Sequence, residues 1–361
     1  MSWVVREEPE TVKIFSVVGA RPQFIKAAAL SRVLRREHQE ILVHTGQHYD
    51  DNMSKVFFDE LDIPQPDFNL EVGSGNHGAQ TGAMLASLEK LLVVERPDWV
   101  LVYGDTNSTL AGALAASKLQ IKLAHVEAGL RSFNRKMPEE INRVIADHLA
   151  DLLICPSQTA LDNLESEGIR RGVHVVGDVM ADSLYFAAER ARSRSSILKN
   201  VGVNEGDYLL ATVHRAENSD EKLRLGNILS AFNELEEKVV FPVHPRTRKS
   251  IESLGFIPSQ NILLIEPVGY LDMVMLEQNS KMILTDSGGI QKEAFWLGIP
   301  CITLRDETEW VETVQTGWNI LVGADKERII RAVKTFIPPL SRPTVYGEKN
   351  TAQRIVKLLI Q

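Results

Sequence analysis

Short, continuous apolar runs alternate along this chain with longer segments in which apolar residues recur every three or four positions. A short apolar run predicts a strand buried on both faces, and the periodic segments predict amphipathic helices. This alternation is typical of an α/β fold in which helices cover both faces of a parallel sheet. A first set of predicted strands comprises residues 12–18, 40–45, 99–103, 122–126, 152–155 and 174–176, with a first helix at 23–36.

The same pattern starts again in the second half of the chain. Its predicted strands are residues 207–213, 239–243, 262–265, 282–285 and 300–303, with helices at 221–238 and 289–297. A polar stretch rich in Arg and Ser, residues 189–204, lies between the two sets and predicts a helix end and a linker. We therefore expect two doubly wound, Rossmann-like domains that face a cleft, because ligands of such sheets bind beyond the carboxyl ends of the strands.

Length, composition and net charge exclude several classes of protein. A chain of 361 residues suits two domains of ordinary size. The net charge of −8 argues against a nucleic-acid partner, and no apolar run approaches the roughly 20 residues that a membrane span needs. The first residues lack a basic segment followed by an apolar one, so no signal peptide is predicted and a cytoplasmic location is expected. Cys155 and Cys301 lie in separate apolar runs, which predicts buried thiols instead of a disulfide.

The residues after the first two strands are candidate phosphate and metal ligands. Arg21 and Lys26 follow Gly19 near the start of a helix, where a diphosphate could bind, although a turn with two solvated cations explains them equally well. His44 and His48 have the spacing of a metal-binding pair. No third ligand at helical spacing follows them, so we expect no metal.

Acidic side chains follow the third and fourth strands of the first set. Asp105 stands directly after Gly104 and begins a polar run longer than the capping of one helix requires. Glu127 ends the next strand, and Glu139 opens a helix in which Arg143, four residues on, could simply pair with it. Three carboxylates in one cleft would shift one another's pKa values and could hold the different protonation states that acid–base catalysis requires.

The second half offers a phosphate site. His214 and Arg215 stand at the tip of its first strand. Ser287, Gly288 and Gly289 lead from a later strand into a helix, whose free N–H groups would bind an anion. Residue Glu293, about one turn further, is placed to accept hydrogen bonds from ribose hydroxyls.

Several cofactor and nucleophile fingerprints are missing from the sequence. No Gly-x-Gly-x-x-Gly follows the first strand, so a nicotinamide or flavin cofactor is not expected. The chain also has no P-loop and no Gly-x-Ser-x-Gly elbow. We therefore expect an enzyme without a cofactor.

Eight stretches, in this order, resemble the non-hydrolysing UDP-N-acetylglucosamine (UDP-GlcNAc) 2-epimerase family: residues 19–26, 45–48, 104–109, 125–131, 138–143, 213–218, 285–293 and 305–309. They span almost the whole chain, and the set is specific where its single members are not. The resemblance implies the two-domain architecture of the GT-B glycosyltransferases, with catalytic carboxylates in residues 1–185 and UDP bound by residues 186–349. It implies that a final helix, within residues 350–361, crosses back to the first domain, and that the protein is a homodimer.

The resemblance also implies an elimination followed by an addition. A base removes the proton at C2 of the sugar while UDP leaves C1, and the resulting 2-acetamidoglucal takes up UDP again after reprotonation on its other face. UDP-GlcNAc and UDP-N-acetylmannosamine (UDP-ManNAc) would interconvert in this way, for precursors of cell-surface polysaccharides. By position, the implied catalytic residues are Asp105, Glu127, Glu139 and His214. The residues implied to bind the UDP-sugar are Arg21, Lys26, Gln47, His48, Arg143, Arg215, Ser287, Gly288, Gly289, Glu293 and Arg305.

Two departures from the family pattern bear on the identity of the sugar. Members that act on UDP-GlcNAc commonly have four threonines after the aspartate, whereas this chain has Asn107 and Ser108 at the middle two positions. They commonly have Arg-Pro after Thr-Glu, whereas this chain has Trp310 and Val311. Both departures resemble the branch that acts on UDP-2,3-diacetamido-2,3-dideoxy-glucuronate, which is the first alternative. The others are a hydrolysing or glycosyl-transferring relative and a nucleotide-sugar binder without turnover.

Overall fold

The computed structural model describes residues 11–47, 55–347 and 349–361. The chain divides into two units: unit 1 is residues 1–183 with 345–361, and unit 2 is residues 184–344. The division falls inside helix α7 (Val179–Arg194), ahead of the polar stretch 189–204. Ala187, Ala188 and Ala191 are buried along α7 while Arg192 and Arg194 are exposed, so a stretch rich in polar residues still forms a helix.

The strands of unit 1 form a seven-stranded parallel sheet in the order β3-β2-β1-β4-β5-β6-β7. They are β1 (Lys13–Val18), β2 (Gln39–His44), β3 (Phe68–Asn69), β4 (Trp99–Tyr103), β5 (Lys122–Val126), β6 (Leu152–Cys155) and β7 (Val173–Val175). The strand order reverses between β1 and β4. In doubly wound sheets this switch point leaves a crevice for ligands beyond the strand ends.

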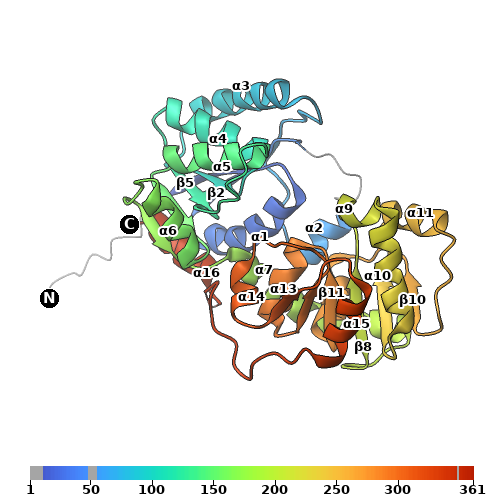
Figure 1. Cartoon of the computed structure of the whole chain (residues 1–361). Helices are drawn as coiled ribbons and strands as arrows, with labels where there is room; N and C mark the ends of the chain where they lie inside the picture. Colours follow the sequence, from blue (N-terminus) through green and yellow to red (C-terminus); the bar gives the residue numbers. More distant parts are fainter. Residues whose placement is uncertain (1–10, 48–54, 348) are drawn as a thin grey trace. The chain divides into compact units, whose positions relative to one another are not determined.

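Helices cover both faces of this sheet (Figure 1). Helices α3, α4 and α5 share a core with β1, β2 and β4 on one face, and α1 and α16 pack together on the other. Besides α7, the helices are α1 (Arg21–Glu37), α2 (Lys55–Leu61), α3 (His77–Glu95), α4 (Asn107–Lys118), α5 (Pro138–Leu149), α6 (Gln158–Ser166) and α16 (Thr351–Leu359).

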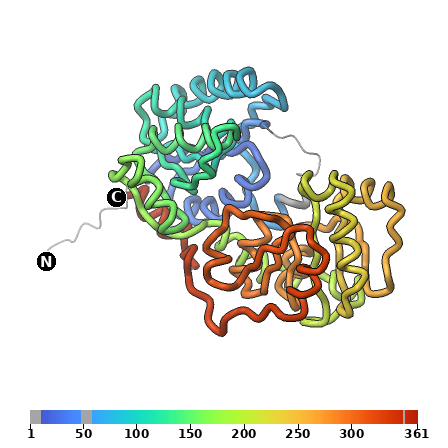
Figure 2. Tube along the Cα trace, viewed as in Figure 1, coloured from blue at the N-terminus to red at the C-terminus, as the bar shows by residue number. Residues whose placement is uncertain are grey.

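The last helix belongs to unit 1, which confirms that it crosses back (Figure 2). Ile355 and Leu359 are buried on α16, which packs against α1. Asp182 of α7 accepts the backbone N–H groups of Asn350 at 2.9 Å and Ala352 at 2.7 Å. A carboxylate at this place satisfies N–H groups that the helix cannot pair internally, and so anchors its start.

Unit 2 repeats the architecture with six parallel strands in the order β10-β9-β8-β11-β12-β13. Its switch point lies between β8 and β11. The strands are β8 (Tyr208–Thr212), β9 (Lys238–Pro242), β10 (Ile262–Ile265), β11 (Met282–Thr285), β12 (Cys301–Thr303) and β13 (Asn319–Leu321). The helices are α8 (Ile197–Val201), α9 (Ala216–Ser219), α10 (Lys222–Glu234), α11 (Pro245–Ser253), α12 (Tyr270–Gln278), α13 (Gly288–Leu297), α14 (Val311–Gln315) and α15 (Lys326–Thr335).

Two apolar clusters lie in unit 2. One joins α10 and α15 to β8 and β9, and the other joins α12 and α13 to β8 and β11. Both cysteines of the chain, Cys155 and Cys301, are buried and free. Within the described ranges, no helix has the length and apolar character needed to span a bilayer.

The packing of α16 predicts how unit 1 responds to truncation of its apolar face. We expect Ile355→Ala to lower the free energy of unfolding of unit 1 by about 2–4 kcal/mol, because it leaves a cavity between α16 and α1. The exposed Lys357→Ala, on the same helix, should change it by less than about 0.5 kcal/mol. Amide hydrogen exchange of peptides from α1 measures both values, and equal effects of the two substitutions would contradict the described packing.

Candidate active site

The loops after β1 and β4 pack together at the switch point of unit 1. Gly19 has no room for a side chain, because a Cβ there would lie 2.0 Å from Ser108 Oγ. The side chain of Gln23 accepts the Gly19 N–H at 2.8 Å and donates to the Tyr103 carbonyl at 2.6 Å. These contacts fix the start of α1 against the end of β4, two residues before Asp105.

Asp105 is held by α5 through both its side chain and its backbone. Its carboxylate forms an ion pair with Arg143, and Asn142 Nδ2 donates to its carbonyl at 2.9 Å. Burial by itself would lower the pKa of Arg143, but Asp105 and Glu140 beside it raise the pKa and keep the guanidinium charged. The Asp105 side chain is 34% exposed, so a ligand can reach it.

Glu127, at the end of β5, has a backbone conformation that is unusual for a residue with a side chain. Its φ of +72° lies in the left-handed region that favours glycine. Its carboxylate pairs with Lys26 of α1, and the two side chains are only 11% and 9% exposed. A Cβ on Gly104 would lie 3.2 Å from Glu127 Oε2, so Glu127 lies beside the backbone that leads to Asp105. Strain of this kind is concentrated at functional sites.

The third predicted carboxylate, Glu139, is exposed in the first turn of α5. Its neighbour Glu140 is buried and accepts the backbone N–H of Ser132 at 2.9 Å. Arg143 pairs with Glu140 and Asp105 instead of forming the i, i+4 pair with Glu139 that the sequence suggested. The reason is that Glu140, unlike Glu139, is buried, where it accepts the backbone N–H groups of the loop before α5 and needs a cation to neutralise it.

In unit 2 a fully buried carboxylate organises the loop after β8. Asp286 accepts the backbone N–H groups of His214 and Arg215, each at 3.1 Å, and lies 3.2 Å from His214 Nδ1. Burial would raise the pKa of Asp286, but these donors, His214 above all, lower it. The His214 side chain is 45% exposed, and the contact at Nδ1 leaves its Nε2 as the nitrogen available to a ligand.

The predicted phosphate site is the first turn of α13. Ser287 precedes it and caps it, with the Ile290 N–H 3.4 Å from its Oγ. A Cβ on Gly288 would lie 2.5 Å from Glu309 Oε1, whereas one on Gly289 would have no heavy atom closer than 3.8 Å. The turn therefore has backbone N–H groups near an open face, next to a carboxylate of the protein itself.

Two arginines surround that carboxylate. Glu309 is 2.9 Å from Arg305 and 3.4 Å from Arg215. Burial opposes ionisation of Glu309, but its hydrogen bonds and the two arginines lower its pKa. Arg305 is almost buried and Arg215 is half-exposed, so Arg215 is the one able to turn toward an incoming anion.

Glu293 lies further along α13 and is almost buried, with Tyr270 Oη donating to its Oε1 at 2.9 Å. The nearby Glu277 is fully buried. Burial and the charge of Glu293 raise the pKa of Glu277 well above its usual range.

The remaining predicted residues occupy varied positions. Arg21 is exposed at the start of α1, and Gln47 is buried with its Oε1 accepting the Ser108 N–H at 2.9 Å. His48 lies outside the described residues. In the parts of the chain that the structure describes, no three His, Cys, Asp or Glu side chains are grouped to hold a metal ion.

Asp286, Asn142 and His125 were not predicted as site residues, although each lies inside a stretch that resembles the family. Asp286 orients His214, and Asn142 binds the backbone of Asp105. Asp286 directly follows an apolar strand, and His125 lies within one. A polar residue in such a place could have been noticed in the sequence, but its partners could not, because they are distant along the chain.

Comparison with known proteins gives consistent matches. Residues 32–360 match the family model described as UDP-N-acetylglucosamine 2-epimerase. A Methanococcus maripaludis "UDP-N-acetylglucosamine 2-epimerase homolog" is 56% identical over 354 residues, covering 96% of this chain and 99% of that protein. The Pseudomonas aeruginosa UDP-2,3-diacetamido-2,3-dideoxy-D-glucuronate 2-epimerase is 49% identical over 358 residues, covering 96% and 99%. The solved structure of Methanocaldococcus jannaschii UDP-GlcNAc 2-epimerase with UDP-GlcNAc and UDP has a TM-score of 0.81 at 45% identity, covering 96% and 98%.

The strained backbone of Glu127 predicts an unusual order of stability between two variants. Glu127→Gly and Glu127→Ala both remove the carboxylate and its pair with Lys26, but only glycine adopts φ of +72° without strain. We expect the glycine variant to have the higher free energy of unfolding by roughly 1 kcal/mol. Hydrogen exchange in β5 measures the difference.

The same pair of substitutions at Glu139 is the matched control. Glu139 stands in a helical turn, where alanine is the better residue, so there the alanine variant should be the more stable. An alanine variant as stable as the glycine variant at Glu127 would mean that the left-handed conformation is not imposed by the fold.

Proposed function

This chain belongs to the UDP-N-acetylglucosamine 2-epimerase family, and we propose that it is a non-hydrolysing epimerase that interconverts UDP-GlcNAc and UDP-ManNAc. Epimerases are isomerases, so the product has the same atoms as the substrate. The observation that carries the proposal is the pair of carboxylates at neighbouring strand ends, Asp105 and Glu127, each held by a buried cation.

We propose that the reaction begins by eliminating UDP. A carboxylate takes the proton from C2, the electrons of the C–H bond form the C1–C2 double bond, and the C1–O bond breaks to release UDP. The 2-acetamidoglucal then accepts a proton at C2 on its opposite face while a phosphate oxygen of UDP adds again to C1. Every atom of the substrate is recovered in the epimer, and no redox partner or cofactor is required.

Unit 1 supports the proton transfers of this scheme. Arg143 and Lys26 keep Asp105 and Glu127 in fixed positions, and a positioned carboxylate is what general acid–base catalysis needs. Glu139, exposed at the N-terminal end of α5, is the third carboxylate of the proposed group. Because such groups share their protons, we assign the acid and base roles to the group as a whole.

Unit 2 supports the release and return of UDP. Charge develops on the diphosphate as the C1–O bond breaks, and fixed N–H groups and cations stabilise such charge most effectively. We propose that Ser287, Gly288 and Gly289 bind the diphosphate with their backbone N–H groups, and that His214 and Arg215 contact it from the loop after β8. Arg21 and Arg305 add positive charge, and Glu293 binds the ribose.

We further propose that the enzyme acts in the cytoplasm, on precursors of cell-surface polysaccharides. Neither a nucleic acid nor a membrane is expected as a partner, given the net charge of −8. The UDP-sugar is the one ligand that the proposal requires.

A second candidate substrate is UDP-2,3-diacetamido-2,3-dideoxy-glucuronate. It is favoured by Asn107 and Trp310, the positions that depart from the common pattern, and by the 49% identity to the P. aeruginosa enzyme of that name. A hydrolysing epimerase and a binder without turnover are the remaining alternatives, and the following experiment distinguishes them from the proposal.

We expect the enzyme to place deuterium at C2 of both epimers when UDP-GlcNAc is incubated in D2O, with no accumulation of free UDP. Asp105→Asn and Glu127→Gln should each lower kcat by about 100-fold or more, because each removes a group that carries or positions the C2 proton. NMR of the product mixture measures isotope and products together, and the same assay with the diacetamido-uronate sugar ranks the two substrates by kcat/KM.

Glu165→Gln, an exposed carboxylate on α6 of the same unit, is the matched control and should leave kcat unchanged. Accumulating UDP would establish a hydrolase instead. An Asp105→Asn variant with full activity would remove Asp105 from the mechanism.

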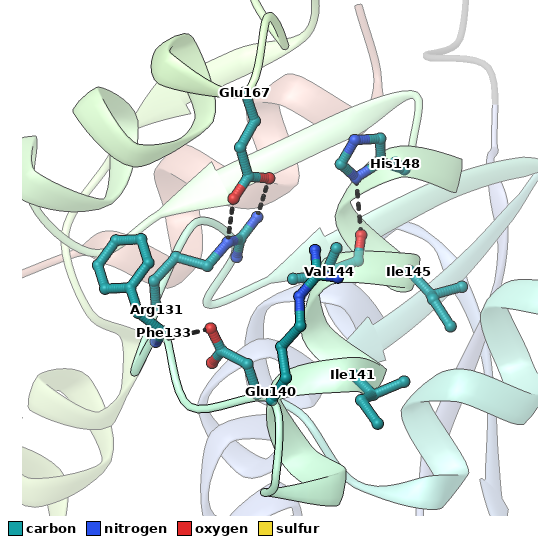
Figure 3. A pocket seen from close by; sticks show the side chains of 9 residues that line it. Arg131, Phe133, Glu140, Ile141, Val144, Ile145, His148 and Glu167 are labelled. Carbon is teal, nitrogen blue, oxygen red and sulfur yellow. Dashed lines mark hydrogen bonds and ion pairs between the residues drawn. The ribbon is translucent and has the colours of Figure 1, made fainter.

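We also propose that the protein forms a homodimer through the outer face of α5. A cavity of about 790 Å³ lies there, lined by Ile141, Val144 and Ile145 (Figure 3). Ile141 is 48% exposed and Phe133, at the edge of the cavity, is 74% exposed. An aromatic side chain beside an apolar groove is self-complementary under two-fold symmetry, since each copy can insert its Phe133 into the groove of the other.

The charges on this face are compatible with a second copy as the occupant. Arg131 and Glu167 form a two-bond ion pair across the cavity, with N–O distances of 2.7 and 2.8 Å (Figure 3). Arg135 and Glu140, which also line the cavity, carry opposite charges as well, so two identical faces can approach without net repulsion.

Ile141→Glu should convert the dimer into a monomer of 40.3 kDa, because it would bury a charge at the centre of the proposed interface. Leu223→Glu, which alters a 75% exposed side chain on α10 of unit 2, should leave the dimer intact. Light scattering after size-exclusion chromatography measures both masses. A wild-type monomer, or a dimer that survives Ile141→Glu, would rule out this interface.

A further inference from the structure

His125 lies on β5, two residues before Glu127, with its ring fully buried. Its Nδ1 is 2.7 Å from Asp147 Oδ1 on α5, and its Nε2 is 2.7 Å from the carbonyl oxygen of Gly104. A carbonyl oxygen and an ionised carboxylate can only accept hydrogen bonds. If Asp147 is ionised, both nitrogens of His125 must donate, and only the protonated ring can do so.

The ionisation of Asp147 therefore decides the charge of the ring. Its second oxygen, Oδ2, accepts Arg131 Nη1 at 2.6 Å and the Gly129 N–H at 3.1 Å. These two donors stabilise the carboxylate form of Asp147, which burial by itself would disfavour. Asp147 is thus the anion of the pair, and a neutral ring beside a protonated carboxyl does not fit these donors.

The charges around His125 balance within unit 1. Arg131 donates to Asp147 and also makes two hydrogen bonds to Glu167, so the cluster contains two cations and two carboxylates. The Cys155 thiol of β6 adds no charge, because burial raises its pKa to about 12. A buried imidazolium is tolerated only where it is compensated in this way.

Gly104 is the point at which the cluster meets the proposed site. Its φ is +62°, its N–H donates to the Val126 carbonyl at 3.0 Å, and its carbonyl accepts from His125. Both polar backbone groups of Gly104 are therefore bound by β5, and Asp105 is the next residue. A hydrogen bond from a charged donor is stronger than one between neutral groups.

We propose that His125 is an imidazolium cation in the folded enzyme and a positioning residue that fixes the Gly104 carbonyl, and with it Asp105, at the end of β4. The ring does not contact the sugar. The effect of His125 on turnover rests on the proposed function. Its charge and its hydrogen bond to the Gly104 carbonyl do not.

The charge is tested on the unmodified chain. Protein labelled with ¹⁵N-histidine should show, by NMR at pH 7.5, two ring N–H signals from one histidine that exchange slowly with water. His148 is exposed, and its Nδ1 is 2.9 Å from the Val144 carbonyl. Its ring should show no N–H signal that exchanges slowly with water. A single protected ring N–H for His125 would overturn the proposal.

The isosteric variant Asp147→Asn removes the anion while keeping its shape. His125 should then lose one of its two ring protons at pH 7.5. Two protected ring protons that persist in this variant would contradict the charge balance described above.

Positioning is tested with His125→Gln. Hydrogen exchange of residues 104–107 should become about tenfold faster, because the charged donor to Gly104 is lost. kcat should fall about tenfold or more while KM stays within about twofold, because Asp105 is displaced and the UDP contacts are not. His174→Gln, an exposed position on β7, should change neither measurement.

These results separate the two proposals. Should the wild-type chain turn over neither UDP-sugar, the proposed function fails, while the NMR and exchange measurements still test His125. If exchange at residues 104–107 is unchanged in His125→Gln, the positioning role is wrong. If this variant does not fold, the same exchange measurement on Asp147→Asn decides, because a neutral ring holds Gly104 less tightly.

Discussion

A carboxylate buried at the end of a parallel strand must have a cation or several N–H donors beside it, because an uncompensated charge is too costly to remove from water. Each acidic residue at the two switch points meets this condition. Glu127 has Lys26, Asp105 has Arg143, and Asp286 has the loop that carries His214. The cations near the proposed catalytic carboxylates therefore stabilise the protein before any ligand is present.

The strands were the most predictable part of the fold, because an apolar run buried on both faces has few alternatives. Residues 99–103 and 122–126 coincide with β4 and β5. The predicted helix 221–238 was too long: α10 ends at Glu234, Leu235 is extended, and β9 begins at Lys238. Apolar spacing continued across that boundary, so periodicity could not locate it. The edge strands β3 and β13 have two and three residues, and they form only because a neighbouring strand supplies hydrogen bonds.

Residues of the proposed site could be predicted where a single short segment of the sequence contains the whole pattern. The Asp after β4 and the Ser-Gly-Gly turn before α13 are local patterns with local reasons. Pairings across the sheet were not predictable. A pair between Arg143 and Glu139 on the same helix was one alternative, yet Arg143 binds Asp105, 38 residues earlier in the chain. His125 lies in the predicted strand 122–126, but its two partners come from the loop after β4 and from α5, and only folding brings them together.

The structure explains why an asparagine can stand at position 107, one of the positions that depart from the family pattern. Asn107 donates to Gln80 Oε1 at 2.8 Å and accepts from Asn142 Nδ2 at 3.2 Å, so it joins α3, α4 and α5. Its side chain is occupied by these contacts, so Asn107 has a packing role in addition to its place in the pattern that bears on the sugar. Charge gives a more direct criterion. Lys26 and Arg143 already neutralise protein carboxylates, so a neutral N-acetyl sugar leaves the balance of unit 1 unchanged. A uronate adds a negative charge that this balance does not offset, so it requires a further cation.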